Sequence, residues 1–172
     1  WLDIVKKLMK HPDIDDLILS KDDQGKTGFM HACHNGRINV VKLHLQHPTN
    51  RDVIVKQDNS EKTGFIHAYL NKREDVVEAL LNHPNNDEML YVSFQVSCKL
   101  GHFGIVELLL KEDNYQEMKH PDLILSKDDE GKTGFMHACH NGWINVVELL
   151  LKHPLKKDLI VQQDNSAETG FI

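Results

Sequence analysis

The chain has 172 residues, of which 40% are hydrophobic and 27% are charged, a balance typical of folded proteins rather than disordered tails. Its formal net charge of -6 disfavours nucleic acid as a partner, because binding to phosphates requires clustered Lys and Arg. Its apolar runs are shorter than the roughly 20 residues of a membrane-spanning helix, so we expect no direct membrane insertion. The odd number of cysteines, three, indicates a reducing, intracellular compartment, and we expect the cytoplasm.

The sequence repeats itself at two periods. Residues 17–66 return as residues 123–172 with 38 of 50 positions identical, an offset of 106 residues. Within that unit, Thr-Gly-Phe and His-Pro recur mostly at a spacing of 36 residues, and a degenerate copy lies between the two clear ones. Internal periods of this length are typical of repeat proteins. We predict one continuous array over residues 1–172, part of a longer array, divided as follows: partial repeat 1–22; repeats 23–58, 59–87, 88–128 and 129–164; partial repeat 165–172.

In chain order, residues 1–10 match the second helix of a repeat. The next expected helix covers about residues 28–35, because Thr27 is a suitable N-cap and Gly36 can adopt the left-handed conformation that ends a helix. A second helix is expected over about 38–46, with an apolar stripe at helical spacing. The same pair is expected again 106 residues later.

The His-Pro dipeptide follows each second helix. At His47-Pro48 we expect the proline to end the helix and the histidine to face the negative end of its dipole in the last turn. The stretch after it contains turn-forming residues such as Asp58 and Asn59. Between Leu81 and Val92 the connection is shorter than the equivalent connection between Leu45 and Thr63. This repeat should therefore lack a full projecting finger, the loop that precedes a first helix.

Thr-Gly-Phe-Met-His-Ala-Cys, followed by Asn-Gly and Val-Val-x-Leu-x-Leu, resembles the ankyrin repeat pattern over essentially the whole chain. The resemblance implies an all-α solenoid of helix-turn-helix repeats with projecting turn or hairpin loops. Glycine replaces the family's proline and should loosen the first turn, and the period of 36 places extra residues in the loop after the second helix. Met30, Ile66 and Met136 replace the family's histidine, so a hydrogen bond that ties the repeat to its loop should be absent.

Metal binding and catalysis find little support. His31, Cys33 and His34 are possible zinc ligands, but they lie on one short helix without the remaining ligands of a tetrahedral site. We expect Cys33 and Cys139 to be small apolar core residues, with no metal and no cofactor. No nucleophile motif or phosphate-binding loop is present, so we expect no enzymatic activity.

The resemblance implies a protein-protein interaction scaffold that binds a partner protein through the concave face of the array. The alternative is a regulatory or anchoring segment of a larger channel or enzyme whose active domain lies outside this chain. Irregular loops can carry individual binding properties, and Tyr115 lies in the longest one. With it, the candidate partner-binding residues are Asp22, Asp23, Gln24, Lys26, His34, Asn35, Asn59, Ser60, Lys62, Leu70, Asn71, Lys99, Leu100, Tyr115, Asp128, Asp129, Glu130, Lys132, His140 and Asn141.

His44 stands on the apolar stripe of its helix, where the copy has Leu150. It is either an ordinary histidine on a locally exposed stripe or a buried one. In the second case, desolvation should lower its pKa.

Overall fold

The computed structural model describes residues 2–112 and 123–170, and within them every regular element is an α-helix. Isolated bridges at Lys21–Thr27 and Lys127–Thr133 close two short hairpin loops without forming strands. The chain divides into two compact units, residues 1–89 and 90–172. The all-α fold class is therefore confirmed.

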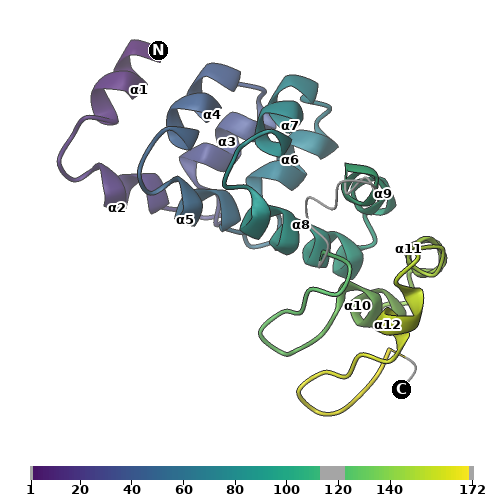
Figure 1. Cartoon of the computed structure of the whole chain (residues 1–172). Helices are drawn as coiled ribbons and strands as arrows, with labels where there is room; N and C mark the ends of the chain where they lie inside the picture. The colour runs from purple at the N-terminus through teal and green to yellow at the C-terminus, as the bar shows by residue number, and fades with distance from the viewer. Residues whose placement is uncertain (1, 113–122, 171–172) are drawn as a thin grey trace. The chain divides into compact units, whose positions relative to one another are not determined.

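The first unit consists of helices stacked in three rows (Figure 1). The first helices of successive repeats, α3 and α6, pack on each other, as do the second helices α1, α4 and α7 and the short helices α2 and α5. The bounds are α1 Leu2–Leu8, α2 Ile14–Leu19, α3 Gly28–His34, α4 Ile38–Leu45, α5 Asn50–Val55, α6 Gly64–Leu70 and α7 Glu74–Leu81.

The second unit repeats the helix pair. Helix α8, which begins before the boundary between the units, is followed by α9, and α11 packs on both α9 and α10. The bounds are α8 Asp87–Leu100, α9 Phe103–Glu112, α10 Gly134–His140, α11 Ile144–Leu150 and α12 Lys156–Ile160. The helix pair expected at 28–35 and 38–46 and its copy are confirmed. Helix α8 runs unbroken through the place where other repeats carry a finger, which confirms the missing finger.

Threonine begins the first helices, as predicted. The Oγ1 atom of Thr27 accepts a hydrogen bond from the backbone N–H of Met30 at 3.3 Å, and Thr63 and Thr133 do the same in their repeats. The Thr27 N–H in turn donates to Sδ of Met30 at 3.5 Å. Methionine thus takes the place that Glu or Gln has in the usual reciprocal cap. Gly36 follows α3 with a φ of 66°, as its predicted role requires.

A third short helix in the loop after the second helix was not predicted. α2, α5 and α12 are only five to six residues long, yet each buries apolar side chains. Val53 and Ile54 of α5 are each 1% exposed. The sequence of this loop predicts a turn rather than a helix, because two adjacent apolar residues show no helical period.

The His-Pro histidines do not act as predicted. α4 ends at Leu45, so His47 lies beyond the helix, and its Nδ1 accepts from the backbone N–H of Thr49 at 3.4 Å. His83 and His153 accept in the same way from the amides two residues later, at 3.3 and 3.2 Å. The ring is therefore a hydrogen-bond acceptor that closes the turn around the proline, outside the last turn of the helix.

Packing explains the glycine after the first-helix threonine at Gly64 and Gly134. A Cβ placed on Gly64 would lie 2.6 Å from Cε1 of Phe29 in the preceding repeat, and 3.1 Å from Sγ of Cys33. Gly134 meets the equivalent pair, Phe94 and Cys98, at 3.0 and 2.8 Å. No heavy atom approaches a Cβ on Gly28 within 4 Å. The Phe rings are fully buried, so a side chain at Gly64 would force them to move.

His44 is buried, with 7% of its surface exposed, and burial lowers its pKa. Its Nδ1 lies 2.9 Å from the carbonyl oxygen of Val40, one turn earlier in α4. Its ring centroid lies 5.6 Å from that of Phe29. The second of the two readings of this residue is thus correct.

Replacing His44 with leucine, the residue of the copy, should raise the free energy of unfolding by about 1 kcal/mol, because it removes a buried polar ring bonded only within its own helix. Urea unfolding followed by circular dichroism measures this. The reverse change, Leu150→His, is the matched control and should destabilise. A His44→Leu protein less stable than the unchanged chain would contradict the prediction.

Candidate functional site

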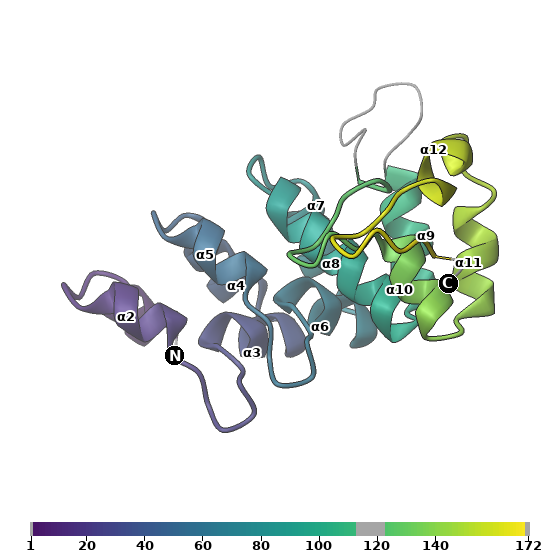
Figure 2. The ribbon, with the colours of Figure 1, turned by 90° about the horizontal axis from the view of Figure 1, so that it is seen from below.

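An aspartate closes each finger, the hairpin loop before a first helix. Oδ1 of Asp22 accepts from the backbone amides of Gln24 and Lys26 at 3.0 and 2.8 Å. Asp58 and Asp128 close the fingers of residues 56–63 and 126–133 with the same pair of bonds. Asp22, Asp58 and Asp128 are therefore turn formers, as predicted for Asp58. Figure 2 shows both fingers of the first unit projecting on the same side, next to α3 and α6.

A histidine ties each of these fingers to its first helix. Nε2 of His31 lies 2.7 Å from Oδ2 of Asp22, and His67 and His137 lie 2.7 and 2.6 Å from Asp58 and Asp128. The prediction that such a bond would be absent is therefore wrong. The histidine stands one residue after the family's position, and the recurring Asp–His spacing of nine residues was the signal for it.

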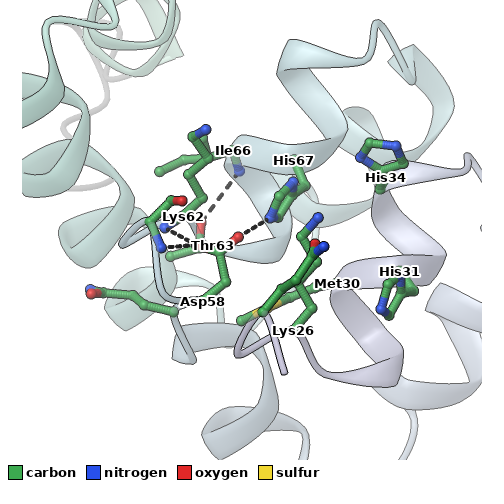
Figure 3. A network of polar contacts seen from close by, with 12 residues as sticks. Lys26, Met30, His31, His34, Asp58, Lys62, Thr63, Ile66 and His67 are labelled. Atoms are coloured by element: carbon green, nitrogen blue, oxygen red, sulfur yellow. Dashed lines mark hydrogen bonds and ion pairs between the residues drawn. The ribbon is translucent and has the colours of Figure 1, made fainter. Parts of the chain in front are cut away.

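The Asp58–His67 pair is the buried one, with side-chain exposures of 3% and 7% (Figure 3). Burial alone would raise the pKa of Asp58, but the amides of Lys62 and Ser60 and the His67 ring together hold it below its usual value. Burial also lowers the pKa of His67, more than the nearby carboxylate raises it. At neutral pH, a neutral His67 therefore donates its Nε2–H to an ionised Asp58.

The two fingers of the first unit are joined to each other. The Nδ2 group of Asn59 donates to the carbonyl oxygen of Asp23 at 3.0 Å, and Nζ of Lys21 donates to the carbonyl oxygen of Gln57 at 2.7 Å. Gly25, with a φ of 75°, leaves room for the Asn59 side chain. The second unit has the same two bonds, at 3.1 and 2.7 Å. The side-chain amide of Asn59 therefore binds the neighbouring finger of the same chain.

A polar cluster joins the C-terminal ends of α3 and α6. Nδ2 of Asn71 donates to the carbonyl oxygen of His67 at 2.8 Å and lies 3.1 Å from Nδ1 of His34. An amide nitrogen can only donate, so Nδ1 of His34 accepts and its hydrogen is on Nε2. Arg73 donates from Nε to the carbonyl oxygen of His34 at 3.0 Å. Burial, and then the fields of the Lys26 and Arg73 cations, lower the pKa of His34.

The predicted partner-binding residues that fall within residues 2–112 and 123–170 are all exposed or half-buried. Tyr115 lies outside the described residues. The structure brings together Lys26, His34 and Asn71, whereas Lys132 pairs with Glu130 at 2.8 Å. Sequence reasoning missed His67 and Arg73, whose contribution depends on packing between repeats.

Residues 2–91 match the family model for ankyrin repeats, in three copies. The chain belongs to the ankyrin repeat family. Its fold is also similar to the crystal structure of EF0377, an ankyrin repeat protein, with a TM-score of 0.54 and 19% identity over 98% of this chain and 80% of that one. No curated protein sequence matches. Ankyrin repeats are generally protein-interaction modules and are typically non-catalytic.

Within the described part of this ankyrin chain, no three His, Cys, Asp or Glu side chains are arranged to hold a metal ion. Burial raises the pKa of the Cys33 and Cys98 thiols, so both remain protonated at neutral pH. Nor does any helix of residues 2–112 and 123–170 have the length and apolar character needed to cross a membrane.

A groove lies between two second helices of the ankyrin repeats, away from the first helices. This groove of about 510 Å³ lies between α4 and α7, lined by residues that include Ile38, Lys42, Leu45 and Glu78. None of the predicted partner-binding residues lines it. It therefore offers positions for control substitutions away from the first helices.

Acid should destabilise the array. His34, His44, His67 and His153 have pKa values below their ordinary 6.5, so the unfolded chain binds more protons than the folded one as pH falls. Above pH 6.5 these histidines are mostly neutral in both the folded and the unfolded chain and have little effect on the free energy of unfolding. As the pH falls below 6.5, they lower it progressively. We expect the free energy of unfolding to decrease between about pH 7 and pH 5.

Urea unfolding at several pH values measures this dependence. The His44→Leu variant provides the control, because removing one of the four histidines should make the dependence shallower. An unfolding free energy that is constant or rises as the pH is lowered from 7 to 5 would rule out the prediction.

Proposed function

We propose that this chain is a protein-interaction scaffold that binds a partner protein through its first-helix face. In the first unit this face consists of the finger tips and the exposed sides of α3 and α6, and in the second unit of the finger tip, the exposed side of α10 and the end of α8. The observation that carries the proposal is the combination of accessible side chains and a fixed backbone. Lys26, His34 and Leu70 are half-buried or exposed. The fingers beside them are joined by hydrogen bonds.

A fixed backbone favours binding because less conformational entropy is lost when the partner docks. Ankyrin arrays use extended surfaces of this kind, each repeat adding one strip of side chains. The net charge of -6 supports a protein rather than a nucleic acid as the partner. The three free cysteines support an intracellular, cytoplasmic setting, and nothing in the described face supports a catalytic role.

The test begins with binders selected from a displayed library of protein fragments, using the whole chain as bait. We expect binding to be lost when His34 and Asn35 are changed to Ala, alone or together with His140 and Asn141. Lys42→Ala and Glu78→Ala, in the groove between α4 and α7, are the matched controls and should leave binding unchanged. Circular dichroism verifies that each variant folds. Binding that survives all four first-helix changes but is lost in the groove variants would contradict the proposal.

A further inference from the structure

The finger that contains Lys26 and its copy that contains Lys132 differ in whether a carboxylate pairs with the lysine. In the second unit, Nζ of Lys132 lies 2.8 Å from Oε2 of Glu130. In the first unit the residue equivalent to Glu130 is Gln24, which carries no charge. Throughout the described ranges, no carboxylate lies within ion-pair distance of the Lys26 ammonium. The same finger therefore presents a paired lysine in one unit and an uncompensated lysine in the other.

Two aspartates of the fingers in the first unit, Asp22 and Asp58, already have other hydrogen-bond partners. Asp22 accepts two finger amides and lies 2.7 Å from His31. Asp58 accepts two amides and the Nε2–H of His67, and its side chain is 3% exposed. Neither carboxylate forms an ion pair with the Lys26 ammonium. The chain as a whole is acidic, which makes an unpaired cation on this face more distinctive.

His34 adds a directed donor beside this cation. Its Nδ1 faces Asn71, so the hydrogen on Nε2 is the one that remains, and no described protein group accepts it. Arg73 is held against the carbonyl oxygen of His34 by its Nε–H. Among the groups whose fields lower the pKa of His34, after burial, Lys26 and Arg73 are permanent cations. The His34 and His67 ring centroids lie 5.8 Å apart, and Figure 3 labels both rings together with Lys26 and His31.

We propose that Lys26 and His34 form the subsite of the first-helix face that receives an Asp or Glu side chain of the partner protein. A carboxylate accepts from an ammonium and from a neutral imidazole N–H at once, and such charge-assisted bonds are the stronger ones. Arg73 adds a second cation whose position is fixed. Leu70, 44% exposed, occupies in α6 the place of His34 in α3, so an apolar residue should lie near the acid in the partner. The inference rests on the proposed function.

The chemistry of the subsite is tested without a partner by titrating the protein with sodium acetate and following the ring protons of all histidines by NMR. Equal concentrations of sodium chloride and of acetamide are the controls. We expect acetate to shift the His34 resonances more than those of His140, which has the same helix sequence but a lysine paired with Glu130. Lys26→Ala and Gln24→Glu should each abolish the difference. Equal shifts at His34 and His140 would overturn the proposal.

The partner class is tested by selecting random peptides, displayed with no free C-terminus, on the unchanged chain. We expect the selected peptides to share an Asp or Glu, and its exchange for Asn or Gln to weaken binding about tenfold, the usual value of one charge-assisted bond. Gln24→Glu should weaken binding similarly, because it supplies Lys26 with an internal partner. Selected peptides that lack an acid but need His34 and Asn35 would refute the acidic subsite and leave the proposed function standing. Peptides that need neither residue, or a failure to select any, would count against both.

Discussion

The close approach of neighbouring first helices is the constraint on which the rest of this structure depends. Phe29 of one repeat occupies the space that a Cβ on Gly64 of the next would fill, and Phe94 does the same against Gly134. Repeats that approach this closely also bring their fingers into contact, which allows Asn59 to bond to the finger before it. The hydrogen bonds between fingers thus follow from the absence of a side chain in the core.

The polar groups of the first-helix face are organised by the same stacking. His67 is buried by the neighbouring repeat and kept neutral, and from there it fixes the finger through Asp58. Asn71, at the end of α6, donates to Nδ1 of His34 on α3. This bond fixes the His34 tautomer that carries its hydrogen on Nε2. The chemistry offered to a partner therefore depends on contacts between two repeats, and a single repeat could not supply it.

Much of the fold could be predicted from the sequence, because caps and helical periods are local. Thr27 begins a helix and Gly36 follows its end for reasons that need no neighbour. The role of Gly64 could not be predicted in this way, because it depends on a ring 35 residues earlier. The short helix α5 lacked a periodic signal, and the bond of His31 to its finger was missed because the histidine is displaced by one residue from the family pattern.

The most direct test of this account compares Gly64→Ala with Gly28→Ala by urea unfolding. Both glycines begin a first helix, but only Gly64 faces a buried Phe from the preceding repeat. We expect Gly64→Ala to lower the free energy of unfolding by about 1–3 kcal/mol through overpacking, and Gly28→Ala to leave it unchanged or raise it by up to about 1 kcal/mol through helix propensity. Equal effects of the two substitutions would contradict the claim that close stacking of the first helices organises the array.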